Sequence, residues 1–193
     1  MEHEIRYVLD TNSYALIFQS PKGDAYEKLE NRLKYEGVVR FYLPEIVAME
    51  IHSVIGKYRR GSAETQHEKC ARTILAKPMP IQCENTCVHQ GRPRMKNKIF
   101  RMIQKLLGDI ESKRGDIQAT LLEIGKQEFE EGRRMLLKYS HQFAFGSHDA
   151  LIAGTVAVAK ERGSELILVT SDKGLKAVCK AQGINIFDPL KDD

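Results

Sequence analysis

The alternation of helix and strand is most regular in SHDALIAGTVAVAKERGSELILVTSDKGLKAVCKAQGINIF, residues 147–187. Ser147 is a favourable N-cap for an apolar helix, and Gly163 is a typical residue to end it. The run contains two helix patterns and two strand patterns, over residues 149–161, 165–170, 173–182 and 184–187. Strands that alternate with helices in this way predict an α/β fold around a mainly parallel sheet.

The same alternation opens the chain. A short apolar strand over 6–9 runs into the polar turn Asp10-Thr11-Asn12, and a second strand over 38–43 is followed by Pro44, which suits the first turn of a helix. Further helices are predicted over 14–18, 24–35, 45–60, 63–75, 96–113 and 116–139. We therefore expect a three-layer α/β/α sandwich in one domain, 1–193, with a helical insertion over 62–140 that carries a cysteine-containing loop and a basic helix.

Length and composition exclude several classes of protein. A chain of 193 residues fits one domain, and 42% hydrophobic with 29% charged residues is too apolar for a disordered chain. No run reaches the roughly 18 apolar residues that span a bilayer, so no membrane association is expected. The N-terminus, MEHEIRYVLD, lacks the basic and apolar regions of a signal peptide, and four cysteines are too few for a disulfide framework. We expect a cytoplasmic protein with reduced thiols.

Four acids stand in unusual surroundings. Asp10 and Asp172 each follow an apolar strand, where ligands bind in open parallel sheets. Asp149 opens a helix that is apolar nearly all round, and Glu50 lies in the apolar run EIVAMEI. An unpaired acid among apolar side chains is costly, which favours a shared role for the four.

Each acid also has an ordinary explanation when it is taken alone. An Asp after a strand often forms a turn, an Asp in the first turn of a helix complements its positive end, and a Glu within a helix is commonly solvated. Four carboxylates in one crevice would repel one another unless a cation joined them, and Mg²⁺ or Mn²⁺ prefers carboxylate oxygens. The residues therefore favour metal-dependent phosphoryl transfer or hydrolysis, in which two ions activate a water and stabilise the leaving oxygen.

The segments that carry these acids resemble the PIN-domain nucleases, in particular their VapC-like branch. The family places an Asp after the first strand, a Glu on an early helix, an Asp at the start of a late helix and a Thr/Ser-x-Asp after the next strand. The resemblance covers residues 5–60 and 145–190 and is carried by YVLDTNSYALI (7–17), VAMEI (47–51), SHDALIAGTVAVA (147–159) and ILVTSDKGL (167–175).

The resemblance implies a PIN-like fold and cleavage of single-stranded RNA by a Mg²⁺- or Mn²⁺-dependent endoribonuclease. Asp10, Glu50, Asp149 and Asp172 would bind the metal, and Asn12 with Thr170 or Ser171 would orient carboxylates or water. Many small members are toxins of toxin–antitoxin pairs, often homodimers held by a cognate antitoxin. The long segment 62–140 departs from the compact toxins, which leaves open an RNA-processing nuclease without an antitoxin. A PIN-like RNA- or protein-binding module without metal is the non-catalytic alternative.

Positive charge is concentrated in one segment. The whole chain carries +4, whereas residues 92–114 hold eight Lys and Arg and two acids, a net +6. Helical spacing over 96–113 places an apolar face opposite a basic stripe that could contact RNA phosphates or merely solvent. The apolar face comprises Ile99, Ile103, Leu106 and Ile110. The basic stripe comprises Lys98, Arg101 and Lys105.

Other constellations carry weaker hypotheses. Two histidines and three cysteines that fall close together could form a zinc site, but their spacing is not that of a zinc motif; they are His67, Cys70, Cys83, Cys87 and His89. His148 could act as a general acid, contact a phosphate or face solvent. A dehalogenase-like phosphatase would need an Asp where Asn12 stands. The chain has no P-loop and no G-x-G-x-x-G motif, which argues against a nucleotide cofactor.

Overall fold

The chain forms two compact units. The computed structural model describes residues 5–62, 65–70, 73–74, 81–83, 85–89 and 91–192. The first unit comprises Met1–His52 with Gln104–Asp193, and the second is Ser53–Ile103. The boundaries fall within two helices, α3 (Glu45–Arg60) and α4 (Asn97–Glu111). Residues 104–140, which the predicted insertion included, belong to the first unit because they supply a strand and a helix to it.

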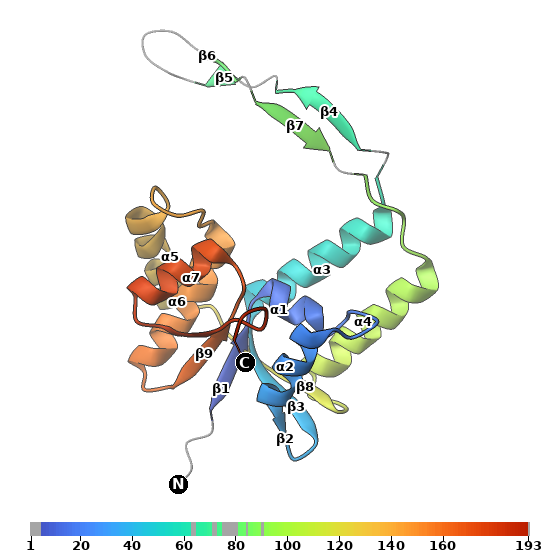
Figure 1. The fold of residues 1–193 in the computed structure, drawn as a ribbon, viewed down its shortest axis with the longest axis vertical. Coiled ribbons are helices and arrows are strands. Elements are labelled where there is room, and N and C mark those ends of the chain that lie inside the picture. Colours follow the sequence, from blue (N-terminus) through green and yellow to red (C-terminus); the bar gives the residue numbers. More distant parts are fainter. Residues whose placement is uncertain are drawn as a thin grey trace. The chain divides into compact units, whose positions relative to one another are not determined.

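A six-stranded sheet forms the centre of the first unit (Figure 1). β1 (Arg6–Leu9) lies between β9 (Leu166–Val169) and β3 (Val38–Pro44), and Val8 is opposite both Leu168 and Tyr42. These pairings are parallel, as are those of β10 with β9 and of β8 with β3, whereas β2 runs antiparallel to β3. The bounds of the outer strands are Asn185–Phe187 for β10, Ile117–Leu122 for β8 and Lys34–Tyr35 for β2. The predicted α/β class with a mainly parallel sheet is confirmed.

Two groups of helices pack on the sheet. α6, which is apolar nearly all round, contacts β9, and α2 contacts β3 (Figure 1). Val8, Leu9, Leu43, Val156 and Leu168 are at most 1% exposed, so the core lies where these helices meet the strands. This arrangement is compatible with a three-layer α/β/α fold. Besides α3 and α4, the helices of the chain that the structure describes are α1 (Thr11–Leu16), α2 (Asp24–Leu33), α5 (Lys126–Tyr139), α6 (Ser147–Glu161) and α7 (Lys173–Ala181).

Three predicted helices are wrong over part of their length. The last two residues of the predicted helix 24–35 form β2, which pairs with β3. Residues 117–122 of the predicted helix 116–139 form β8, because they pair with β3 along six residues, and this long-range pairing outweighs local helix propensity. Gly125 is then the N-cap of α5. Within the predicted helix 63–75, residues 66–69 and 73–74 are strands. Their partners, residues 86–89 and 81–82, lie where the cysteine-containing loop was expected. The remainder of that predicted helix lies outside the described residues.

The described part of the second unit contains two two-stranded antiparallel sheets. β4 (Gln66–Lys69) pairs with β7 (Thr86–His89), and β5 (Thr73–Ile74) pairs with β6 (Ile81–Gln82). Among the described residues of this unit, Cys70 is the only buried apolar side chain. Its described part therefore has no apolar core comparable with that of the first unit.

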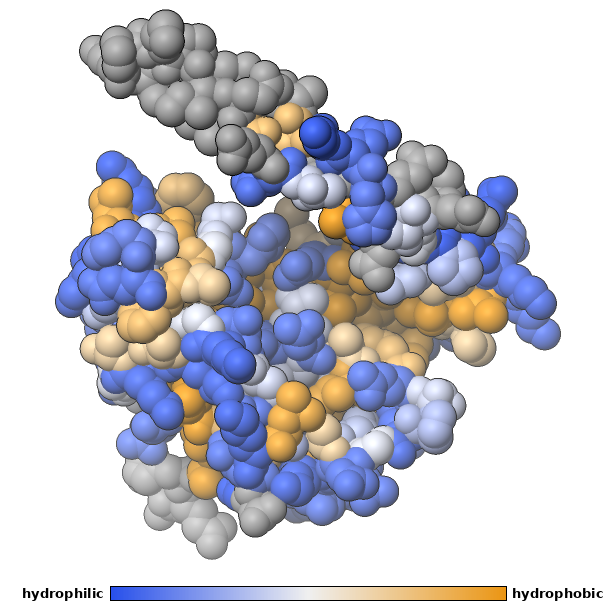
Figure 2. Space-filling view, turned by 45° about the horizontal axis from the view of Figure 1, so that its top comes forward, coloured by the Kyte–Doolittle hydropathy of each residue, from blue (hydrophilic) through white to orange (hydrophobic). Residues whose placement is uncertain are grey.

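Apolar side chains are also present on the surface. Figure 2 shows hydrophilic side chains over much of the viewed face, with apolar side chains between them. Met49 and Met102 are 67% and 63% exposed, and Leu137 is 74% exposed. None of the helices in the described ranges has the length and apolarity that crossing a membrane requires.

Glycines let α5 and α6 approach closely. A Cβ on Gly154 would lie 2.6 Å from the backbone oxygen of Glu128 and 2.8 Å from the nitrogen of Gly132. A Cβ on Gly132 would in turn lie 2.8 Å from the backbone oxygen of Ala150. These neighbours are backbone atoms that cannot turn aside, so the glycines are needed for the contact and not only tolerated in the helices.

Gly154→Ala should lower the free energy of unfolding by about 1–3 kcal/mol, because the added methyl group forces α5 and α6 apart. Urea denaturation followed by circular dichroism measures the change. Gly108→Ala is the matched control, since Gly108 lies inside α4 with nothing within 4 Å of a Cβ. The control should gain about 0.4–1 kcal/mol. Equal changes in the two variants would contradict the close approach of α5 and α6.

Candidate active site

The four predicted acids line one cavity of about 110 Å³. Asp10 and Asp172 reach it from the carboxyl ends of β1 and β9, Glu50 from α3, and Asp149 from the first turn of α6. All four belong to the first unit. The complete lining is Asp10, Thr11, Asn12, Glu50, His148, Asp149, Ile152 and Asp172.

Asp10 is the most buried of these acids. It is the N-cap of α1, and its Oδ1 accepts a hydrogen bond from the backbone N–H of Ser13 at 2.6 Å. Only 3% of the residue is exposed. Burial raises the pKa of Asp10 above its ordinary value, and the charge of Asp172 adds to the rise, although hydrogen bonds from Thr170 and Ser13 oppose it.

Asp172 has the same role at the start of α7. It is the N-cap, and its Oδ1 accepts a hydrogen bond from the N–H of Leu175 at 2.7 Å. Thr170 is fully buried beneath the two acids: its Oγ1 accepts from the N–H of Asp172 at 3.1 Å, and its side chain hydrogen-bonds to Asp10. Thr170 therefore links the carboxylate of Asp10 to the backbone at Asp172.

Asp149 is held at the start of α6. The N-cap is Gly146 and not the predicted Ser147, because Oδ2 of Asp149 reaches back to accept from the N–H of Gly146 at 3.0 Å. Burial raises the pKa of Asp149, and the charges of Asp172, Asp10 and Glu50 raise it further. Asp149 thus interacts electrostatically with all three other acids, as expected of a single cluster.

Glu50 is joined to the N-terminal segment by a residue that the sequence analysis did not single out. The hydroxyl of Thr11, the first residue of α1, donates a hydrogen bond to Oε2 of Glu50. Thr11 and Glu50 are 39 residues apart in the chain, so no local pattern could have paired them. Asn12 and His148 are exposed and line the same cavity, which places their polar groups within reach of a bound molecule.

The cavity is strongly acidic. Its described lining contains no Lys or Arg, and the raised pKa values of Asp10 and Asp149 reflect burial and mutual repulsion. The N-termini of α1, α6 and α7 face these carboxylates and offset part of their charge. Four carboxylates are the donor set that a hard divalent cation prefers. Among the described residues, however, no three His, Cys, Asp or Glu side chains are placed to hold a metal ion together.

Ser171 hydrogen-bonds to Asp188, an acid that does not line the cavity. Its hydroxyl donates to Oδ1 of Asp188, which also forms an ion pair with Lys176. Although burial works to raise the pKa of Asp188, hydrogen bonds from Lys176, Ser171 and Leu190 outweigh it and hold that pKa below its ordinary value. Asp188 was not among the predicted site residues, although it directly follows β10 as Asp10 follows β1. The position of an acid after a strand could have identified it.

The predicted basic helix is present as α4, with a different buried face. Lys98, Arg101 and Lys105 are all exposed. Ile110 is buried as predicted, and Leu107 is buried beside it. The predicted packing is wrong for Ile99 and Leu106, which are 42% and 39% exposed. Ile99 belongs to the second unit, whose described part has little apolar surface to cover it.

Three of the five residues considered for a zinc site have side chains that the structure describes. Cys70 and Cys83 are free thiols, and His67 is exposed. The side chains of Cys87 and His89 lie outside the described residues.

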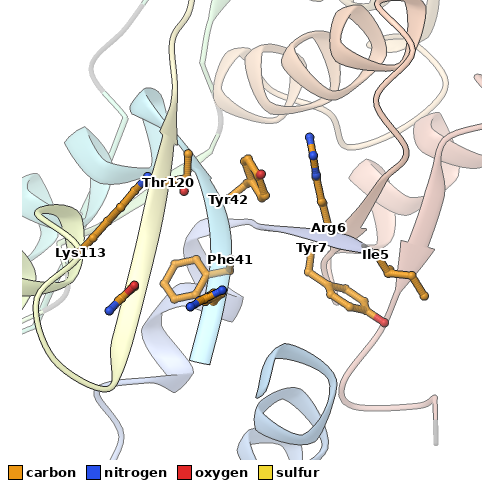
Figure 3. Close-up of a pocket in the computed structure, with 9 residues that line it drawn as sticks. Ile5, Arg6, Tyr7, Phe41, Tyr42, Lys113 and Thr120 are labelled. Atoms are coloured by element: carbon orange, nitrogen blue, oxygen red, sulfur yellow. The ribbon is translucent and has the colours of Figure 1, made fainter. Parts of the chain in front are cut away.

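A second cavity, of about 250 Å³, lies on the sheet and has the opposite charge (Figure 3). Arg6, Tyr42 and Thr120 point to one side of the strands, and Phe41 and Tyr7 to the other. The guanidinium of Arg6 lies 5.7 Å from the centroid of the Tyr42 ring. The charged side chains in its described lining are Arg6, Arg40 and Lys113, all of them cationic. The full lining is Ile5, Arg6, Tyr7, Arg40, Phe41, Tyr42, Lys113, Gln118 and Thr120.

Comparison of the chain with protein-family models gives no match, and comparison with curated proteins gives none. The function is therefore argued from the residues and geometry of the acidic cavity.

Proposed function

We propose that the chain is a PIN-type endoribonuclease that hydrolyses phosphodiester bonds of single-stranded RNA with Mg²⁺ or Mn²⁺. One observation carries the proposal: Asp10, Glu50, Asp149 and Asp172 converge on one cavity from four separate segments, and none of the described residues that line it is Lys or Arg. An RNA phosphate would be repelled by this cluster on its own. A divalent cation removes the repulsion, which is why the acids and an anionic substrate fit together only with metal.

Bound divalent ions would supply an activated water and stabilise the leaving oxygen of the cleaved phosphodiester. The protein's own contribution is to hold the carboxylates. Backbone N–H groups of Ser13, Gly146 and Leu175 fix Asp10, Asp149 and Asp172, and Thr11 fixes Glu50. Each carboxylate therefore enters the cavity from a defined direction.

The polar groups at the rim are assigned to the substrate. Asn12 and His148 are exposed and line the cavity, so we assign them to hydrogen bonds with the RNA phosphate. Lys98, Arg101 and Lys105 are exposed on α4 and are proposed to contact phosphates further along the strand. The toxin of a toxin–antitoxin pair and an RNA-processing nuclease are the two candidate roles within this class.

A specific observation favours a second candidate, a non-catalytic RNA-binding module. Every acid of the cavity already accepts a hydrogen bond from another residue of the chain, and three of them stabilise helix starts. In the described part of the chain no three donors are placed to hold a metal together. Such a module would retain the acids for the fold and bind RNA without cleaving it.

A cleavage assay separates the two candidates. A 5′-labelled single-stranded RNA incubated with the purified chain should be cut with Mg²⁺ or Mn²⁺ present and remain intact in excess EDTA. Asp149→Asn should be inactive under both conditions. Asp24→Asn is the matched control, because Asp24 is exposed at the start of α2 and lines none of the cavities described above. EDTA-resistant cleavage would contradict the metal mechanism, and RNA binding without cleavage would favour the non-catalytic module.

A further inference from the structure

The two units carry opposite net charge. Residues 53–103 contain eleven Lys and Arg and three acids, a net +8. The other residues contain nineteen Lys and Arg and twenty-three acids, a net −4. The mild overall charge of +4 therefore conceals an acidic unit that contains the cavity and a strongly basic unit outside it.

Much of this charge is gathered by the fold into one place, which we call the basic neck. It joins the end of α3, residues 57–62, to the segment 92–98 that leads into α4 (Figure 1). Its cations are Lys57, Arg59, Arg60, Arg92, Arg94, Lys96 and Lys98. Among the described residues, none of these seven lies within ion-pair distance of a carboxylate.

Backbone contacts hold the two segments of the neck together. The N–H of Met95 donates to the carbonyl of Tyr58 at 2.8 Å, and the N–H of Ser62 donates to the carbonyl of Arg92 at 3.1 Å. Gly61 has φ +69°, and a Cβ there would lie 3.0 to 3.2 Å from atoms of Arg94. The close packing of like charges is thus imposed by the fold, against their mutual repulsion.

We propose that the basic neck binds the sugar–phosphate backbone of single-stranded RNA, with Tyr58 as a surface on which a base stacks. Four of the seven cations are arginines, whose planar groups match phosphate oxygens. Tyr58 is 41% exposed on α3, and Lys57 and Arg59 are its neighbours in the sequence. An aromatic face among cations is the combination that binds unpaired nucleotides. The choice of RNA as the polyanion rests on the proposed function.

The neck is less suited to a lipid surface. Membrane binding by basic segments is strengthened by apolar side chains that enter the bilayer. Within residues 57–62 and 92–98, Tyr58 is the only large apolar side chain that is exposed. An anionic membrane is therefore the competing partner that the experiment must distinguish.

Fluorescence anisotropy with a labelled single-stranded RNA, in EDTA so that no cleavage occurs, tests the neck. Arg60→Glu/Arg94→Glu/Lys96→Glu should raise Kd at least tenfold. The magnitude of the slope of log K against log salt should fall by about 0.7 for each lost phosphate contact. Lys126→Glu/Arg133→Glu/Lys138→Glu is the matched control, with the same change in charge on exposed residues of α5. It should bind nearly as the wild type does.

Tyr58 gives a second test that leaves the charge unchanged. Tyr58→Ala should weaken binding of single-stranded RNA several-fold, whereas Tyr58→Phe should retain it. Unchanged affinity in both the triple-Glu neck variant and Tyr58→Ala would overturn the proposal, as would equal losses in the neck and α5 variants. Binding of the wild type to phosphatidylserine vesicles but not to RNA would also overturn it. RNA binding that depends on the neck without any cleavage would uphold the neck and reject the nuclease.

Discussion

Asp10→Asn should reduce metal-dependent RNA cleavage by more than about 100-fold, because loss of even an outer hydrogen-bond partner at a metal site typically costs 10–100-fold. The substitution keeps the shape of the side chain and removes the charge that would bind the cation. The Asn oxygen can still accept from the N–H of Ser13, so the cap of α1 is preserved. Initial cleavage rates at matched RNA and metal concentrations measure the effect.

The same variant should fold at least as stably as the wild type in metal-free buffer at neutral pH. Because burial and the charge of Asp172 raise the pKa of Asp10, the folded protein binds this proton more tightly than the unfolded chain does. The stability that Asp10 contributes is therefore present below its ordinary pKa and lost as the pH rises through the raised value. Loss of the circular-dichroism signal in Asp10→Asn would instead make Asp10 structural, and retained cleavage would remove it from the metal site.

Mg²⁺ or Mn²⁺ should raise the melting temperature of the wild type by about 5–10 °C at a hundredfold excess over Kd. A ligand that binds only the folded state adds about 2.7 kcal/mol at that excess. For a chain of this size, 1 kcal/mol corresponds to roughly 2–4 °C. Relief of the repulsion at Asp10 and Asp149 should lower the Kd for the cation, so this excess should be reached at a lower metal concentration than at an ordinary surface site. Differential scanning fluorimetry at constant ionic strength measures the shift.

The double variant Asp10→Asn/Asp149→Asn locates the ion. Its melting temperature should not respond to the divalent cation, since two of the four carboxylates are gone. The neck variant Arg60→Glu/Arg94→Glu/Lys96→Glu should respond as the wild type does, because its residues belong to the second unit. An equal shift in the double variant would place the cation elsewhere in the chain.

The parts of the fold that were predicted from sequence are those whose residues carry their own pattern. The apolar strands β1 and β9 and the apolar helix α6 have a local signal, and all three were predicted close to their observed bounds. β8 has no such signal, because its extended form depends on its pairing with β3. The ribbon β4–β7 was missed for the same reason: each strand is specified by a partner far along the chain.

The residues of the candidate site also differ in how far the sequence could predict them. Asp10 and Asp172 could be brought together from sequence because the ends of parallel strands meet at one edge of a sheet. The partners that hold the acids were harder to find. Thr11 contacts Glu50 across 39 residues, and Ser171 turns to Asp188, whose ion pair with Lys176 forms only in the folded chain. The acidic residues of the site could be predicted from the sequence, whereas the residues that hydrogen-bond to them could not.

The hydrogen bonds at the starts of α1, α6 and α7 have an entropic consequence. A flexible carboxylate loses rotational freedom when it captures a ligand, at about 0.5–1.5 kcal/mol for each immobilised side chain. Asp10, Asp149 and Asp172 lose that freedom earlier, when the chain folds and their oxygens accept backbone N–H groups. Glu50 is restrained likewise by Thr11. Under the proposed function, these side chains would therefore lose little further freedom on binding a cation, and the affinity for the cation would be set chiefly by charge and desolvation.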